Sequence, residues 1–229
     1  MNVQINSLLS GAIQATGVVV IIDVFRAFTT AAVAIAQGAK EIILVSSAEE
    51  ALALRGSAVA HACMGEVRGR RPEGFDFGNS PFEVSRARMM GQTIVLRTSA
   101  GTQGVVNASQ AQKLYCGSLV TAEATTAAIA RDATKDITLV AMGENGETRA
   151  DEDELCAIHL RNRLEGRSSN RNAIRELILA SARISDFSDS MKSHLHPQDL
   201  EIALDIDRFN FAIGVSVEEA RPVARKVRI

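Results

Sequence analysis

The chain has 229 residues, of which 46% are apolar and 23% charged, and its formal net charge at pH 7 is −2. These values are typical of a globular protein, give no basic field that would attract nucleic acid, and leave no apolar stretch of the roughly 18 residues that a membrane span needs. The three cysteines are too few and too widely spaced for a disulfide framework, and the N-terminus lacks the basic start of a signal peptide. We therefore expect a cytoplasmic protein that binds neither nucleic acid nor membrane.

The first part of the chain is predicted to alternate strands with helices. Apolar runs, typical of buried parallel strands, predict strands at 18–23, 42–45 and 59–63. The helix after the first strand is expected to be capped by Thr29 or Thr30 and to stop at Gly38. Ser47 and Glu50 form a capping box that opens the helix after the second strand.

A long loop is predicted over 65–80, because this segment contains four glycines, three arginines and a proline and is too irregular for a helix. Loops of this length in compact domains are often functional. A helix is expected to restart after the loop, with Ser80 as its cap, Pro81 at its first position and Glu83 three residues after the cap.

The second part of the chain repeats the alternation. Strands are predicted at 93–97, 114–116, 137–142 and 209–215. Helices are predicted at 103–109, 121–131, 151–164, 170–184 and 197–204. Strands that alternate with helices predict a three-layer α/β/α fold with a largely parallel sheet.

A repeat with an offset of 72 positions indicates that the sheet units are internally duplicated. Six residues recur, as the pairs Ile22/Ile94, Thr30/Thr102, Val33/Val105, Ala36/Ala108, Ala39/Ala111 and Ser46/Ser118. The tripeptide Met-Gly-Glu at 64–66 also recurs, at 142–144, and each copy follows an apolar run. We interpret 1–90 as the first α/β half and 91–229 as the second, with added C-terminal helices and a last strand.

Polar residues follow the predicted strand ends, which is where ligands bind in open α/β sheets. Asp23 ends the first strand, with Arg26 close behind, and this pair suits either a metal and anion site or a structural ion pair. The loop adds Glu66 and Asp76, whose carboxylate oxygens are ligands that Mg²⁺ prefers. We therefore expect Mg²⁺ on some of Asp23, Glu66 and Asp76, and we expect Glu66 and Glu144 to border the pocket that holds Asp23.

The segment Arg97-Thr98-Ser99-Ala100-Gly101-Thr102 is the strongest candidate for an anion cradle. It joins a strand to a helix, and its hydroxyl groups and backbone N–H groups could hold phosphate oxygens. It contains neither a Walker A motif nor a dinucleotide fingerprint. The structural alternative is that Arg97 pairs with an acidic residue of the other half and never meets a ligand.

Four segments together resemble the 2-phosphosulfolactate phosphatase family, known as ComB. They are IDVFRAFTT (22–30), GFDFGNSP (74–81), RTSAGT (97–102) and DELCA (153–157). The resemblance implies an α/β/α fold, dependence on Mg²⁺ and hydrolysis of 2-phospho-3-sulfolactate to 3-sulfolactate and phosphate, a step of coenzyme M biosynthesis in archaea. The chain departs from the family pattern at Ala100, where an Asn is usual, and at Val67, which separates Glu66 from Arg68.

These observations predict a Mg²⁺-dependent phosphatase that acts on a small anionic substrate. The expected catalytic residues are Asp23, Arg26, Glu66 and Arg97. The expected substrate-binding residues are Arg68, Asn79, Thr98, Ser99, Gly101, Thr102 and Glu144. No DxDx(T/V) string accompanies Asp23, so we expect attack by water and not by a carboxylate. The alternative, favoured by Ala100, is a non-catalytic phosphate- or sulfonate-binding module, and a homodimer is left open.

Overall fold

In the computed structural model, which describes residues 1–131, 136–189, 192 and 194–229, the strands form one nine-stranded sheet with the order β1-β7-β2-β6-β8-β9-β3-β5-β4. The strands are β1 (Asn2–Ser7), β2 (Gly17–Ile22), β3 (Glu41–Val45), β4 (Ala62–Gly65), β5 (Thr93–Arg97), β6 (Ala111–Gly117), β7 (Asp136–Ala141), β8 (Phe211–Glu218) and β9 (Arg221–Arg228). All neighbours pair in parallel except those that involve β8 or β9. The largely parallel sheet predicted from the alternation is thereby confirmed.

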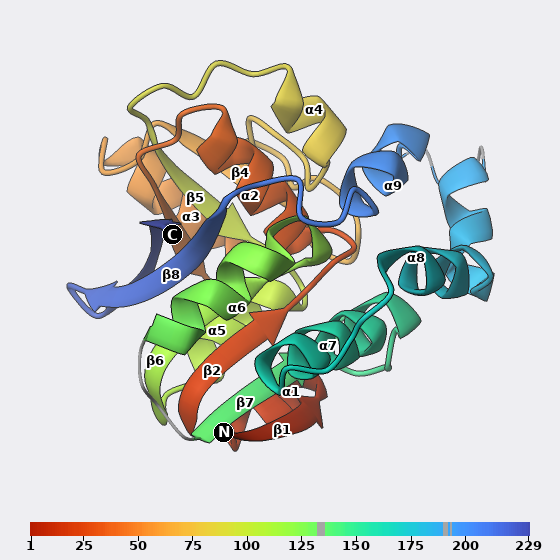
Figure 1. The fold of residues 1–229 in the computed structure, drawn as a ribbon. Helices are drawn as coiled ribbons and strands as arrows, with labels where there is room; N and C mark the ends of the chain where they lie inside the picture. Colours follow the sequence, from red (N-terminus) through yellow and green to blue (C-terminus); the bar gives the residue numbers. More distant parts are fainter. Residues whose placement is uncertain (132–135, 190–191, 193) are drawn as a thin grey trace.

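Helices cover both faces of this sheet (Figure 1). The α-helices are α1 (Leu8–Ile13), α2 (Ala27–Ala36), α3 (Ala48–Gly56), α4 (Pro81–Ser85), α5 (Gly101–Asn107), α6 (Ala122–Arg131), α7 (Asp151–Leu164), α8 (Arg171–Leu179) and α9 (Pro197–Ala203). Two short 3₁₀ helices are η1 (Leu119–Thr121) and η2 (Ala182–Ser188). Within the described ranges, no helix has the length and apolar character that crossing a membrane requires.

Side chains of β2 show how the layers are built. Val19 and Ile21 pack in the same core cluster as the buried residues of α2, whereas Val20 packs with Ile129 of α6 and Leu160 of α7. Successive residues of a strand point to opposite faces of a sheet, so a strand between two helical layers must be apolar throughout. The continuous run that predicted β2 is therefore explained by burial on both faces, in agreement with the three-layer fold.

Each half of the chain contributes the first strand of its repeat, β2 or β5, to the sheet unit formed by the other half. β2 lies between β7 and β6, and β5 lies between β4 and β3, so both units have the same parallel three-stranded arrangement. In the repeat, β3 and β4 correspond to β6 and β7, while β2 corresponds to β5. Figure 1 shows the exchange by colour, since the orange-red β2 lies beside the green β7 and the yellow-green β5 lies in the other, orange part. The halves 1–90 and 91–229 are consequently interleaved in the sheet.

An antiparallel hairpin joins the two units. β8 pairs with β6 of one unit, β9 pairs with β3 of the other, and the two strands pair with each other along their whole length. Only one strand was predicted here, at 209–215. β9 was missed because its sequence, RPVARKVR, is too charged to give an apolar strand signal. β1 and α1 near the N-terminus were missed as well.

The helix caps test the local predictions one by one. Ser47 and Ser80 accept hydrogen bonds from the backbone N–H groups of Glu50 and Glu83, and α2 ends just before Gly38, as predicted. The cap predicted at Thr29 or Thr30 is wrong, because α2 already begins at Ala27 and both threonines lie inside it. The Asp23 carboxylate accepts the hydrogen bond from the Ala27 N–H instead.

Candidate active site

A pocket of about 200 Å³ lies where the loops after β2, β4, β5 and β7 meet residues 186–187, 192 and 194–195 of the C-terminal part of the chain. Its lining consists of Asp23, Phe25, Arg26, Glu66, Arg68, Gly69, Asn79, Ser99, Ala100, Gly143, Glu144, Asn145, Asp186, Phe187, Lys192, His194 and Leu195. Asp23, Glu66 and Glu144 thus border one pocket, which is the placement expected from the repeated Met-Gly-Glu. Because β2 and β7 belong to one unit and β4 and β5 to the other, the pocket is shared between the two sheet units.

Asp23 connects these two units. Its side chain is only 5% exposed. One carboxylate oxygen, Oδ1, accepts a hydrogen bond from the Ala27 N–H at 3.0 Å, at the start of α2, and the other, Oδ2, accepts one from the Gly101 N–H at 2.9 Å, at the start of α5. Both oxygens are therefore fixed in orientation, and a carboxylate oxygen is a ligand of the kind that Mg²⁺ takes.

Glu66 has a matching role at the end of β4. Its Oε1 accepts a hydrogen bond from the Ser99 N–H at 2.5 Å, and its Oε2 accepts one from the Gly69 N–H at 2.5 Å and one from the Ser99 hydroxyl at 3.1 Å. The side chain is buried. A second carboxylate at a strand end is therefore held rigidly against the loop that begins α5.

The threonine-rich loop does not offer the anion cradle that its sequence suggests. The Thr98 N–H donates to Thr102 Oγ1 at 2.8 Å, the Thr102 N–H donates to Thr98 Oγ1 at 3.1 Å, and the Thr102 hydroxyl donates to the Thr98 carbonyl at 2.9 Å. Thr98, Gly101 and Thr102 are absent from the pocket lining, so the structure does not support them as direct ligands. Asp23 and Glu66 already supply the negative charge that N–H groups near a helix start attract.

Arg97, which was expected to be catalytic, is hydrogen-bonded to the surrounding chain. Its Nε donates to the Ser46 carbonyl at 3.2 Å, and its Nη1 donates to the Glu66 carbonyl at 2.7 Å and to Ser99 Oγ at 3.1 Å. It does not line the pocket. The guanidinium therefore ties together the chain where β3, β4 and β5 end, through carbonyl oxygens and not through the acidic partner considered as the alternative.

Asp76 is not brought to Asp23 and Glu66. Its Oδ2 accepts a hydrogen bond from the Cys63 N–H at 2.8 Å, and its Oδ1 lies 2.8 Å from Arg55 Nη2 in an ion pair. It is not part of the pocket lining. The expected three-carboxylate set is therefore not assembled, because the loop folds back and Asp76 pairs with β4 and α3. Among the residues that the structure describes, no cluster of three or more His, Cys, Asp or Glu is arranged to hold a metal ion.

A further carboxyl group, that of Asp153, lies against the residues that follow β2 and β7. Asp153 is buried and accepts hydrogen bonds from the Val24 N–H at 2.7 Å and the Gly143 N–H at 2.8 Å. Burial raises the pKa of Asp153 well above its usual range, and the charges of Asp23 and Glu152 raise it further. Buried carboxylates that repel one another in this way favour a nearby cation.

The donor set fits Mg²⁺. Asp23, Glu66 and Glu144 offer only hard carboxylate oxygens toward the pocket. Mg²⁺ typically binds one or two protein carboxylates and completes its shell with water and phosphate oxygens, so it needs no larger protein cluster. Of the three carboxylates expected to hold Mg²⁺, Asp23 and Glu66 line the pocket and Asp76 does not.

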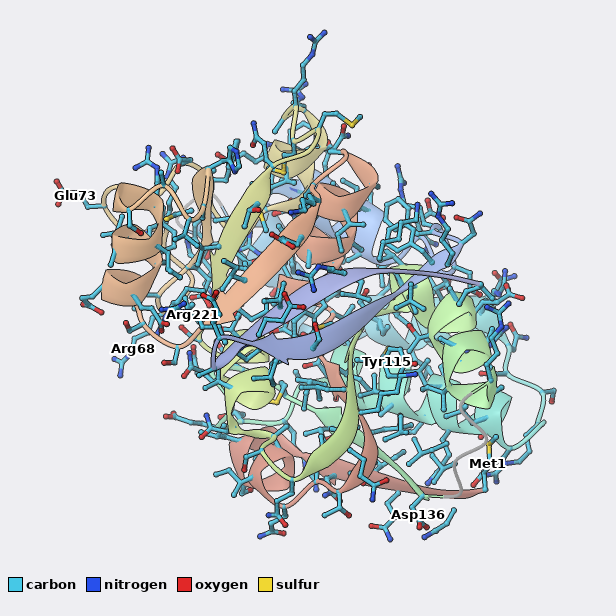
Figure 2. All side chains as sticks on the ribbon, turned by 90° about the vertical axis from the view of Figure 1, so that its left-hand side faces the viewer. Met1, Arg68, Glu73, Tyr115, Asp136 and Arg221 are labelled. Atoms are coloured by element: carbon cyan, nitrogen blue, oxygen red, sulfur yellow. The ribbon has the colours of Figure 1, made fainter. Side chains whose placement is uncertain are left out.

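Three cationic side chains line the same pocket and could neutralise an anion. Arg26 is only 5% exposed, and its Nη1 donates to the His194 carbonyl and to Asp199 Oδ2, both at 2.8 Å. Lys192 Nζ lies 2.7 Å from Asp186 Oδ2, which offsets part of its charge. Arg68 is exposed, and Figure 2 shows its side chain extending away from the ribbon at the edge of the molecule. Arg26 is consequently the cation that is best fixed in place.

The C-terminal segment is the part of the site that the sequence analysis missed. It contributes Phe187, Lys192 and His194 to the pocket wall, and no motif in this polar stretch pointed to them. Burial lowers the pKa of His194, and the nearby charges of Arg26, Arg70 and Lys192 lower it further, while Glu66 raises it. The pocket thus combines carboxylates at the strand ends with cations from the loops after β2 and β4 and with Lys192 from the later segment.

Comparisons with known proteins identify the family to which this chain is similar. The sequence model of the family described as 2-phosphosulpholactate phosphatase matches residues 4–216. A probable 2-phosphosulfolactate phosphatase of Deinococcus radiodurans is 37% identical over 136 residues, which are 59% of this chain and 57% of that protein. Proteins with the same description from Thermotoga petrophila and Bacillus subtilis are 38% identical over 127 residues and 33% identical over 149 residues. The matched stretch covers 54% and 64% of those two relatives, so it spans less than two thirds of each of the three.

Proposed function

This chain belongs to the 2-phosphosulpholactate phosphatase family, and from this premise we propose that it is a phosphoric monoester hydrolase. The proposed reaction converts 2-phospho-3-sulfolactate, or a similarly small anionic phosphomonoester, to 3-sulfolactate and phosphate. The observation that carries the proposal is the shared pocket, whose lining contains Asp23, Glu66 and Glu144 together with the buried Arg26. Carboxylates that can bind Mg²⁺ next to a fixed guanidinium form the kind of site that phosphoryl transfer requires.

In the proposed mechanism, water attacks phosphorus while the ester P–O bond breaks, and the proton of the water ends on the leaving alkoxide. Asp23 and Glu66 would hold Mg²⁺, which when bound supplies positive charge to the phosphoryl oxygens. Arg26 neutralises a further anionic group of the substrate, and it is positioned in advance because its Nη1 is already hydrogen-bonded. Phe25, Phe187 and Leu195 add apolar surface to the wall, which limits water around the reacting group.

The proposal also includes a cytoplasmic location and Mg²⁺ as the metal. Cys63, Cys116 and Cys156 are all free and buried, as expected for a chain in a reducing compartment, and this supports a cytoplasmic location. Mg²⁺ is supported by the three carboxylates Asp23, Glu66 and Glu144 in the lining of the pocket.

One observation favours the competing function, a non-catalytic module that binds phosphate or sulfonate. Ala100 lines the pocket at the start of α5 and presents only a methyl group there. A site that binds an anion but lacks one functional group could have kept affinity and lost turnover.

A phosphate-release assay separates the two functions. The purified protein is incubated with a panel of small phosphomonoesters, including 2-phospho-3-sulfolactate, with Mg²⁺ and with EDTA. The phosphatase proposal expects release that EDTA abolishes and that added Mg²⁺ restores. Binding of inorganic phosphate without release from any ester would support the binding module and contradict the enzyme.

A further inference from the structure

Asp199, near the start of α9, is buried where three distant parts of the chain meet. Its Oδ2 accepts a hydrogen bond from Arg26 Nη1 at 2.8 Å and one from the His196 N–H at 3.3 Å. Its Oδ1 accepts a hydrogen bond from the Ser80 hydroxyl at 2.6 Å and one from the Phe82 N–H at 3.0 Å. The side chain of Asp199 is fully buried. One carboxylate therefore connects the loop after β2, the start of α4 and the start of α9.

The contact between Arg26 and Asp199 is a buried ion pair, with 5% and 0% of the two side chains exposed. Removing charged groups from water costs free energy that such a pair often fails to recover, so its main contribution is frequently to fix geometry. An arginine side chain has many rotamers, and a carboxylate that holds one nitrogen restricts them. The pair thus gives Arg26 a defined direction beside the pocket.

We propose that Asp199 is the positioning residue of Arg26: it holds the guanidinium at the pocket wall for an anionic group of the ligand. This inference rests on the proposed role of Arg26 as an anion ligand. Asp199 itself does not line the pocket and acts only through Arg26. Because the same carboxylate also binds α4 and lies at the start of α9, Arg26 is positioned only when the C-terminal part of the chain has packed against the first half.

The chemistry of the four contacts explains why a carboxylate is needed here. The two backbone N–H groups and the Arg26 Nη1 group can only donate, so both oxygens must accept. An asparagine would place an NH₂ group against donors on one side or the other. Asp199→Asn therefore loses either the contact with Arg26 or the contact with Phe82, together with the charge that balances the guanidinium.

A double-mutant cycle tests the inference, with the affinity for inorganic phosphate measured by calorimetry in the presence of Mg²⁺. The four proteins are the wild type, Arg26→Ala, Asp199→Asn and the double variant. Arg26→Ala is expected to weaken phosphate binding about tenfold to hundredfold. Asp199→Asn is expected to weaken it by a large part of that factor. In the Arg26→Ala background, Asp199→Asn is expected to have no further effect, because it acts through Arg26.

Several results would overturn the inference. Additive losses in the cycle would mean that Asp199 acts independently of Arg26. Tighter phosphate binding by Asp199→Asn would mean that the carboxylate only reduces the positive charge of Arg26. Unchanged phosphate affinity in Arg26→Ala would mean that Arg26 is not an anion ligand. This measurement can be interpreted whether or not the wild type hydrolyses any ester.

Ser80→Ala serves as the matched control, because it removes a hydrogen bond to the other oxygen of the same carboxylate. It is expected to lower the melting temperature and to leave phosphate affinity unchanged. If Ser80→Ala lowers phosphate affinity as much as Asp199→Asn does, the role of Asp199 is merely structural. If Asp199→Asn does not fold, Asp199→Glu replaces it in the cycle, since this change keeps the charge and displaces the oxygens from Arg26.

Discussion

The carboxylate of Asp23 and the N–H of Gly101 form a 2.9 Å hydrogen bond between the ends of the two exchanged strands. Asp23 follows β2, and Gly101 begins the helix after β5, so the bond joins the central strands of the two sheet units. The analogous bond from the Ser99 N–H to Glu66 joins the same loop to the end of β4. The carboxylates proposed to hold Mg²⁺ therefore also hold the two units together, and catalytic and structural effects of their variants are coupled.

Asp23→Asn is expected to abolish phosphate release and also to lower stability. Asp23 is only 5% exposed and accepts hydrogen bonds from backbone N–H groups on both oxygens. An asparagine would turn its NH₂ group toward one of these N–H groups and leave a buried donor without an acceptor. The expected loss in free energy of unfolding is about 1–3 kcal/mol, measured by urea denaturation.

Calorimetric titration of the folded Asp23→Asn variant with Mg²⁺ tests the ligand assignment separately. The expected result is weaker Mg²⁺ binding than in the wild type. An affinity equal to that of the wild type would remove Asp23 from the metal ligands, whatever happens to stability.

Arg97→Ala is expected to reduce stability without affecting anion binding. The guanidinium donates to the carbonyls of Ser46 and Glu66 and to the hydroxyl of Ser99, and the variant loses these three hydrogen bonds. The melting temperature should fall, with a loss of about 1–3 kcal/mol in free energy of unfolding. Inhibition by free phosphate should match that of the wild type. Arg88→Ala, at an exposed position, is the control and should change neither quantity.

Weaker phosphate inhibition in Arg97→Ala would restore Arg97 to the site. That outcome would require the side chain to turn from the loop into the pocket when the ligand binds.

Thr30 and Thr102 occupy equivalent positions of the repeat, but we expect their replacement by valine to have different effects on the free energy of unfolding. Both side chains are fully buried. The Thr102 hydroxyl accepts the Thr98 N–H and donates to the Thr98 carbonyl, whereas Thr30 Oγ1 has no hydrogen-bond partner among the described residues. Thr102→Val should lose about 1–3 kcal/mol of unfolding free energy, and Thr30→Val should be close to neutral or stabilising.

Chemical denaturation of both valine variants under the same conditions measures the difference. Equal losses at the two positions would show that the reciprocal hydrogen bonds of the 98–102 loop contribute nothing beyond packing.

His159 is expected to make stability depend on pH. Burial lowers its pKa below the usual 6.5, and although Asp207 raises the pKa, Arg163 and Arg171 lower it again. The unfolded chain therefore binds the proton more readily, so this contribution is complete above about pH 6.5 and is lost as pH falls through the lowered pKa. Urea denaturation at a series of pH values should show the free energy of unfolding decreasing over that range.

His159→Gln is the comparison for this pH series, since glutamine has no charge to gain. Its free energy of unfolding should decrease less over the same range. Curves of equal slope for the two proteins would assign the pH dependence to other groups.

Local signals determined most of the elements. The apolar run of β2, the capping residues Ser47 and Ser80, and the stop at Gly38 depend on residues within a few positions of each other, so one sequence is enough to predict them. The repeat also determined that Glu66 and Glu144 share a pocket with Asp23, because equivalent strands of a duplicated parallel sheet end at the same edge. β9 escaped prediction because its strand character depends on the neighbours that it pairs with.

Only the tertiary structure decided which unit each central strand joins and which polar groups face the pocket. Local patterns show that a strand is apolar on both faces but do not identify its partners, so the exchange of β2 and β5 left no signal in the chain. Polar side chains likewise bind whichever donors and acceptors the folded chain brings near. Arg97 binds a backbone carbonyl group, and Asp76 binds Arg55. Asp199, which lies 173 positions from Arg26 in the sequence, binds the Arg26 guanidinium at the pocket. Composition and spacing limited the candidates to a set of residues, and long-range packing selected the members that face the ligand, because hydrogen-bond partners are set by distance in space.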